Sequence, residues 1–239
     1  MTQAFFDRSG RIARPPYRLL WRELGSFLFD HPAAPDAAVM PRGDGHPVLV
    51  IPAFLSGDFA TAPLRRFLRD CGFRAEGWGL GVNWGPTPAI LDGLQRRLSD
   101  LRRKGQGSDG GTVSLIGVSL GGLLARDLAR KRAADVRQVI TLVSPWHLPT
   151  ASTIEPAVHV ASRFYSHDID PAGISAPLPV PATSIYTRDD GIVAWQSCFA
   201  ERPGESVIEV AGPHTTICRN RAALLAVANC LAAAPRRDA

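Results

Sequence analysis

Short apolar runs alternate with amphipathic stretches along most of this chain. The runs at 47–51, 113–118 and 136–143 carry apolar residues at both odd and even positions, which is typical of strands buried on both faces. The same pattern predicts further strands at 73–78, 183–186 and 207–210, and helices at 63–71, 87–103, 120–132 and 221–233. Strands separated by helices indicate a parallel sheet covered on both sides, with functional groups at the carboxyl ends of the strands.

The first 45 residues depart from this alternation. Between 16 and 30, apolar residues such as Trp21, Leu24 and Leu28 recur at helical spacing, with Arg18 and Arg22 on the polar side. We expect an amphipathic helix packed on the main body, with contact to a lipid surface as the alternative. The residues from 32 to 45 are rich in Pro, Gly and Asp and predict a linker.

The stretch from Ser144 to Pro181 also interrupts the alternation. It is rich in Pro, His and aromatic residues, with at most a short helix near 157–165. Connections this long within a compact domain usually have a function of their own, such as a lid. We therefore expect residues 145–181 to form a cap over the strand ends.

Composition narrows the function classes. The formal charge is +5, but the basic residues are scattered, so a nucleic-acid partner is not indicated. The four cysteines are widely spaced and contain no CxxC pair, so a zinc or redox motif has no support. We expect free thiols. If the protein is exported, Cys198 and Cys218 are the pair to test for a disulfide. No apolar run is long enough for a signal-peptide core or a membrane span, so we expect a cytoplasmic protein.

The run 113–118 leads into Gly117-Val118-Ser119-Leu120-Gly121 and directly into a predicted helix. A Gly-x-Ser-x-Gly segment between a strand and a helix is typical of a sharp turn that projects a nucleophilic serine, with glycines where any Cβ would collide with neighbouring backbone. The helix N-terminus beneath the serine favours developing negative charge. Ser119 is therefore the candidate nucleophile.

A serine needs a base, and the base needs an acid that holds its tautomer. Of the six histidines, His214 follows the last predicted strand and precedes the final helix, which fits the chain order Ser, acid, His. Two carboxylates, Asp189 and Asp190, follow the fifth strand. We prefer Asp190 because Gly191 lets the loop turn immediately after it, and Asp189 is then structural or paired with Arg188.

Acyl transfer also needs two backbone N–H donors for the oxyanion. The residue after the nucleophile, Leu120, supplies one. The loop after the first core strand supplies the other, from Phe54 or, as the second choice, Leu55. Leu55, together with Trp146 and Phe164 in the insertion, is also expected to line an apolar substrate site.

Several segments together resemble the α/β-hydrolase superfamily, in particular small bacterial lipase-like esterases: the residues 52–57, GWGLGVNWG, GVSLGGLLAR and YTRDDGIVAW. The resemblance covers about residues 48–239. It implies an α/β fold with a minimal, mostly parallel sheet of about six strands, a serine hydrolase acting on small-molecule carboxylic esters, and no metal or organic cofactor. We therefore divide the chain into an N-terminal helix and linker, 1–45, and one catalytic domain, 46–239.

The resemblance leaves alternatives open. Thioesterases and acyltransferases share the fold, and so do binding proteins without activity. The natural ester, its acyl-chain length and the oligomeric state do not follow from the sequence.

Overall fold

Six parallel strands form the central sheet of the computed structural model, which describes residues 12–29, 34–104, 111–147, 150–154 and 171–233. The strand order is β2-β1-β3-β4-β5-β6, and every neighbouring pair is parallel. The strands are β1 (Pro47–Ile51), β2 (Arg74–Gly77), β3 (Val113–Val118), β4 (Val136–Leu142), β5 (Ala182–Tyr186) and β6 (Glu205–Glu209). The expected sheet of about six parallel strands is confirmed.

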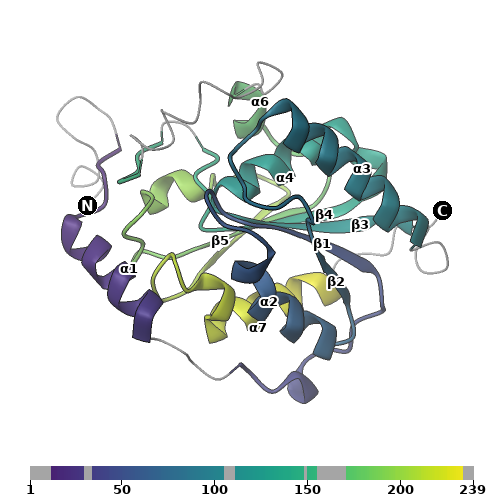
Figure 1. Cartoon of the computed structure of the whole chain (residues 1–239), viewed down its shortest axis with the longest axis horizontal. Coiled ribbons are helices and arrows are strands. Elements are labelled where there is room, and N and C mark those ends of the chain that lie inside the picture. The colour runs from purple at the N-terminus through teal and green to yellow at the C-terminus, as the bar shows by residue number, and fades with distance from the viewer. Residues whose placement is uncertain (1–11, 30–33, 105–110, 148–149, 155–170, 234–239) are drawn as a thin grey trace.

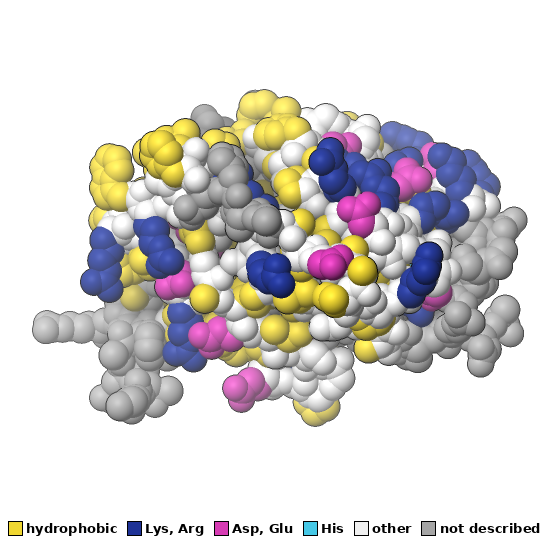
Figure 2. Space-filling view, turned by 90° about the horizontal axis from the view of Figure 1, so that it is seen from below, with side chains coloured by type: hydrophobic (Ala, Val, Ile, Leu, Met, Phe, Trp, Pro, Cys, Tyr) yellow, Lys and Arg dark blue, Asp and Glu magenta, His cyan; other side chains and the backbone are white. Residues whose placement is uncertain are grey.

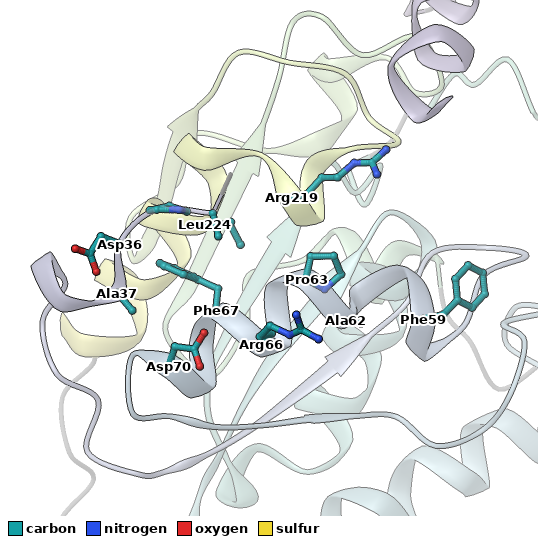
Figure 3. Close-up of a pocket in the computed structure, with 12 residues that line it drawn as sticks. Asp36, Ala37, Phe59, Ala62, Pro63, Arg66, Phe67, Asp70, Arg219 and Leu224 are labelled. Carbon is teal, nitrogen blue, oxygen red and sulfur yellow. The ribbon is translucent and has the colours of Figure 1, made fainter. Parts of the chain in front are cut away.

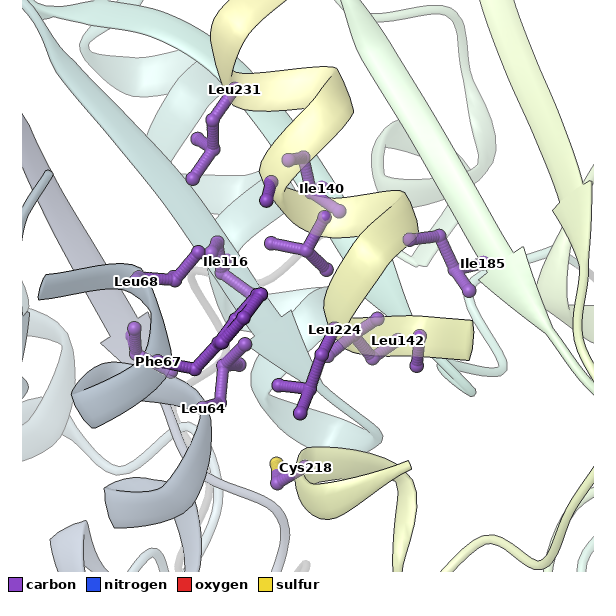
Figure 4. Packing of buried hydrophobic residues seen from close by; sticks show 14 of the residues in the cluster. Leu64, Phe67, Leu68, Ile116, Ile140, Leu142, Ile185, Cys218, Leu224 and Leu231 are labelled. Carbon is purple, nitrogen blue, oxygen red and sulfur yellow. The ribbon is translucent and has the colours of Figure 1, made fainter. Parts of the chain in front are cut away.

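Helices cover both faces of this sheet (Figure 1). On one face lie α2 (Asp58–Asp70) and α7 (Arg221–Ala233), and on the other lie α3 (Pro88–Lys104) and α4 (Leu120–Lys131). Side chains alternate along each strand, so Val48 and Val50 of β1 enter one core while Leu49 and Ile51 enter the other. Figure 4 shows the first core, in which α2 and α7 pack against β3, β4 and β5. Two buried cores explain why the central strands carry apolar residues on both faces.

Two helices differ from the sequence prediction. α2 begins at Asp58, before Pro63, which lies inside the helix and cannot donate to the Phe59 carbonyl. Asp58 places a favourable negative charge in the first turn. The short helix α6 (Pro171–Ser175) was not expected. The helix expected near 157–165 lies outside the described residues, as does much of the proposed cap.

The amphipathic helix near the N-terminus, α1 (Tyr17–Phe29), forms as expected and packs on the body by its polar side. Glu23 and Ser26 are buried, whereas Trp21 is 74% exposed and Leu24 and Leu28 are also exposed. Within the described residues, no helix is both long and apolar enough to cross a bilayer. Burial of Glu23 instead of the apolar side needs strong polar partners, which the loops after β5 and β6 provide. The boundary at residue 45 stays a prediction.

Candidate active site

The carboxyl ends of β1, β3, β5 and β6 meet along one edge of the sheet, because all the strands are parallel. Between β3 and α4, Ser119 has φ 51° and ψ −122°, a strained conformation for a residue with a side chain. A Cβ on Gly117 would lie 2.3 Å from the Gly121 carbonyl oxygen, and one on Gly121 would lie 2.5 Å from the Ile51 carbonyl oxygen. The turn therefore requires both glycines of the Gly-x-Ser-x-Gly segment.

The loops after β5 and β6 bring Asp190 and His214 together. Asp190 Oδ2 lies 2.7 Å from His214 Nδ1, and Asp190 Oδ1 accepts hydrogen bonds from the N–H groups of Ile192 and Val193, each at 2.8 Å. Both side chains are buried. Burial lowers the pKa of His214, but Asp190 and the nearby Glu23 outweigh it, so the His214 pKa is raised above 6.5. The pair is therefore suited to hold and release a proton near neutral pH.

The neighbouring Asp189 has a different environment. Its Oδ2 accepts a hydrogen bond from the Gly212 N–H at 3.0 Å, and its Oδ1 lies 3.1 Å from an Arg22 nitrogen. Arg188 instead pairs with Glu209 at 3.1 Å. The expected alternative of an Asp189 to Arg188 pair is therefore wrong, since Arg188 turns toward β6 and Asp189 toward α1.

A cavity of about 300 Å³ brings Ser119 and His214 to a common apolar surface. Phe54 and Leu55 line it from the loop after β1, Phe59 lines it from α2, and Phe27 lines it from α1. Among the described residues no hydrogen bond joins the Ser119 hydroxyl to His214. Asp190 and His214 are thus in contact, while His214 and Ser119 share the cavity. Hydrogen bonds between catalytic groups often tighten only when substrate binds.

The loop after β1 carries the candidate oxyanion donors. The Leu55 N–H donates to the Asn83 carbonyl at 2.8 Å, so it is not free to serve an oxyanion. The Phe54 N–H has no partner among the described residues, and the Leu120 N–H, at the first position of α4, has none within its helix. Leu55 also has φ 57°, and buried Asn83 donates from Nδ2 to the Pro52 carbonyl at 2.7 Å. Asn83 therefore fixes this loop on both sides of Phe54.

A second Ser, His and Asp cluster lies at the opposite ends of the strands. His46 Nε2 is 2.9 Å from Ser114 Oγ, and His46 Nδ1 contacts Asp44. His46 and Ser114 are fully buried, and Gln138 also donates to the Ser114 hydroxyl at 3.4 Å. A substrate carbonyl has no access to this serine, so the cluster joins the strand ends and Ser119 stays the better candidate.

One residue expected to bind substrate, Trp146, does not line the cavity. Trp146 is buried, donates to Ser184 Oγ at 3.1 Å and lies under the Arg126 guanidinium, 3.6 Å from its ring centre. This packing replaces the expected substrate contact, because β4 ends in a turn that directs Trp146 into the body. Phe164 lies outside the described residues. Leu55 does line the cavity.

A larger hollow of about 610 Å³ lies between α2 and the C-terminal elements (Figure 3). Arg66, Asp70 and Arg219 line it together with apolar residues, and Phe59 borders both this hollow and the smaller cavity. It contains neither Ser119 nor His214. The smaller cavity is therefore the candidate site, because it is lined by both Ser119 and His214.

Sequence reasoning missed two residues that hold the site, Glu23 and Asn83. Asn83 stands within the quoted segment GWGLGVNWG, so its position was noted without its role. Glu23 carried no signal, because one glutamate on an amphipathic helix is ordinary for a solvated face.

No protein-family model and no curated protein matches this sequence. Solved structures do match in fold. Carboxyl esterase 2 from the mycorrhizal fungus Tuber melanosporum has a TM-score of 0.61 at 13% identity, covering 84% of this chain and 81% of that one. The thermostable carboxylesterase EstE1, cloned from a metagenomic library, has a TM-score of 0.58 at 15% identity, covering 80% and 81%.

Other similar structures differ in their chemistry. The thioesterase domain from the curacin biosynthetic pathway has a TM-score of 0.50 at 15% identity, covering 80% of this chain and 92% of that one. Tomato methylketone synthase I complexed with 2-tridecanone has a TM-score of 0.51 at 12% identity, covering 78% and 98%. These matches show that the chain has the α/β-hydrolase fold.

Proposed function

We propose that this chain is a serine hydrolase that cleaves carboxylic esters, with Ser119 as nucleophile, His214 as base and Asp190 as the acid that orients it. The observation that carries the proposal is the strained Ser119 turn opening on the same cavity as a His214 side chain held by Asp190. The likeness to carboxylesterases in fold supports it.

The proposed reaction proceeds through an acyl-enzyme. Ser119 Oγ attacks the ester carbonyl carbon while His214 Nε2 takes its proton, and Asp190 stabilises the imidazolium through Nδ1. The N–H groups of Phe54 and Leu120 stabilise the oxyanion. His214 then protonates the departing alkoxide. A water next attacks the acyl-serine carbonyl and gives its proton to His214, which passes it to Ser119 Oγ as the C–Oγ bond breaks and the carboxylic acid leaves.

The cavity lining favours an apolar acyl group. Leu55, Ile154 and Ile192 face the space beside Ser119, and a volume of about 300 Å³ holds a short to medium chain. A similar fold, tomato methylketone synthase I, has been crystallised with a long-chain ketone. Because each buried CH₂ contributes about 0.8 kcal/mol, extending the acyl group from two to six carbons should raise kcat/KM up to roughly a hundredfold.

An exposed apolar surface adjoins this cavity. Trp21, Leu24 and Phe27 of α1 are exposed, as are Leu55 and Phe59 across the opening. Figure 2 shows hydrophobic side chains gathered along the upper edge of one face, with basic and acidic side chains mixed over the same face. The exposed apolar side of α1, together with Arg18 and Arg22 on the same helix, favours an anionic lipid surface as the partner that presents the ester. Replacing Trp21 by serine should weaken sedimentation with phosphatidylserine vesicles, and unchanged binding would exclude the contact.

Ester hydrolysis tests the proposal directly. Purified protein is assayed against p-nitrophenyl acetate, butyrate and hexanoate, beside a Ser119→Ala variant whose fold is checked by thermal unfolding. We expect hydrolysis by the parent and none above background by the variant. Activity that survives in the variant would refute Ser119, and a steady fall from acetate to hexanoate would make the enzyme a short-chain esterase.

A thioesterase or acyltransferase is the second candidate function, because one structure with a similar fold is a thioesterase domain. A thioesterase or acyltransferase would use the same acyl-serine with a thioester substrate or an alcohol acceptor. Analysis of the products formed in the presence of an added alcohol separates these reactions. The ester of that alcohol identifies an acyltransferase, and the free carboxylic acid identifies a hydrolase. A chain that forms no acyl-serine with any of these substrates would be a binding protein.

A further inference from the structure

Glu23 lies in α1, far in sequence from the proposed catalytic residues, yet its side chain is buried in their loops. It is 2% exposed. Its Oε1 accepts hydrogen bonds from the N–H of Gly191 at 2.9 Å and from the N–H of His214 at 2.8 Å. Its Oε2 accepts from the N–H and the hydroxyl of Thr215, both at 2.8 Å. One carboxylate therefore joins the loop of the proposed acid to the loop of the proposed base.

The Glu23 carboxylate contacts the two loops next to the proposed catalytic residues. Gly191 directly follows Asp190, so Oε1 bridges the residue after the acid and the backbone of the base itself. Hydrogen bonds from N–H groups to a carboxylate are shorter and stronger than neutral ones. Removing the carboxylate would leave buried N–H groups unsatisfied in both loops at once.

The helix backbone fits the same loop closely. A Cβ added to Gly191 would lie 2.5 Å from the Leu19 carbonyl carbon and 2.7 Å from the Leu20 nitrogen. At the other end of α1, Arg219 donates to the Phe27 carbonyl at 2.9 Å. The helix is thus fixed at both ends, which places Glu23 in one position and accounts for the exposed apolar side of α1.

Burial of a second carboxylate near His214 has an electrostatic consequence. The charged groups that favour the imidazolium are Asp190 on the loop after β5 and Glu23 on α1, and together they raise the His214 pKa against its burial. Cys218, which lines the same cavity, stays a neutral thiol because burial raises its pKa to about 12. Arg22 is engaged by Asp189. Glu23 therefore adds negative charge that no cation in these contacts cancels.

We propose that Glu23 is a positioning residue whose carboxylate holds the Asp190 and His214 loops in register and places a second negative charge beside His214 during acyl transfer. The proposal rests on the function proposed above. Glu23 acts through the loops and the field of its charge, without contact to substrate.

The test separates charge from geometry. Glu23→Gln keeps the size and removes the charge, Glu23→Asp keeps the charge and shortens the reach, and Glu201→Gln, at an exposed glutamate before β6, is the matched control. The His214 pKa is measured by NMR titration of the imidazole, assigned with a His214→Gln variant. The rate of labelling by a fluorophosphonate is measured on the same samples.

We expect Glu23→Gln to lower the His214 pKa by about one unit and Glu23→Asp to leave it raised. Both variants should be labelled at least about tenfold more slowly at pH 8, and the control should match the parent. A folded Glu23→Gln variant with parental pKa and labelling would overturn the proposal. If Glu23→Gln does not fold, the slower labelling of a folded Glu23→Asp supports positioning, and parental labelling overturns it.

Failure of the proposed function would look different. A parent protein that takes no label refutes the serine hydrolase, while the NMR titration still reports whether Glu23 acts on His214. A lower pKa in Glu23→Gln then supports the electrostatic part of the proposal, and an unchanged pKa overturns it.

Discussion

Replacing Asp190 by asparagine removes one charge from the acid and base pair with little change in shape. Oδ1 still accepts the N–H groups of Ile192 and Val193, so the loop keeps its hydrogen bonds. The new amide NH₂ then faces His214 Nδ1, at the place of a contact of 2.7 Å. An NH₂ donor requires Nδ1 to accept, which places the imidazole proton on Nε2 and leaves no base for Ser119.

The magnitude follows from the loss of the working tautomer. Such a change lowers kcat by about 10⁴ in Ser-His-Asp enzymes, which corresponds to about 5 kcal/mol of transition-state stabilisation. Asp189→Asn is the matched control. Asp189 accepts from the Gly212 N–H and pairs with Arg22 at the partly exposed surface, where an ion pair contributes about 0–1 kcal/mol, so we expect less than about a fivefold loss.

The assay is kcat for p-nitrophenyl acetate, with thermal unfolding of each variant as the check on folding. A loss of several orders of magnitude in Asp190→Asn beside a small loss in Asp189→Asn is the expected ranking. The reverse ranking would move the acid to Asp189, and equal small losses would refute a carboxylate acting through His214.

Three further predictions concern other parts of the account. Because Asp190 helps to raise the His214 pKa above 6.5, kcat/KM should fall on acidification through that raised pKa, and a profile flat between pH 5 and 8 with chemistry limiting would argue against this base. Arg126→Met leaves the Glu205 carboxylate, 3.1 Å away, buried without its partner and should lower the free energy of unfolding in urea by about 3–5 kcal/mol, whereas a loss below about 1 kcal/mol would mean the pair is dispensable. Gly121→Ala puts a Cβ 2.5 Å from a carbonyl oxygen at the end of β1 and should abolish hydrolysis, so a variant with parental activity would show that the turn tolerates a side chain.

The central sheet could be predicted from the sequence because its residues obey simple rules. Strands buried on both faces carry apolar residues on both faces, and a helix can begin at a clear signal, as α3 does at Pro88. The positions of Ser119 and His214 follow from the chain order, since parallel strands bring their carboxyl ends to one edge. Neither the sheet nor these two positions requires knowing which residues far apart in the sequence touch each other.

Contacts between distant segments could not be predicted in this way. The periodicity of α1 is the same whether its apolar side faces the core or the solvent, and only the N–H groups near His214 decide that Glu23 is buried. Trp146 was likewise expected to contact substrate because it stands in the insertion that should lie over the strand ends, whereas its packing under the buried Arg126 determines its place. Asn83 accepts a hydrogen bond at its backbone carbonyl and donates one from its side-chain amide, both with the loop after β1. A pattern of residue types does not reveal such contacts.

Intact-mass analysis after treatment with a fluorophosphonate tests the central claim most directly, because the reagent reacts with a serine only when a base activates it. We predict one adduct per chain, located by peptide mapping at Ser119, and no adduct in Ser119→Ala or after replacement of His214 by glutamine. An unmodified parent protein, or an adduct that persists in Ser119→Ala, would contradict the account.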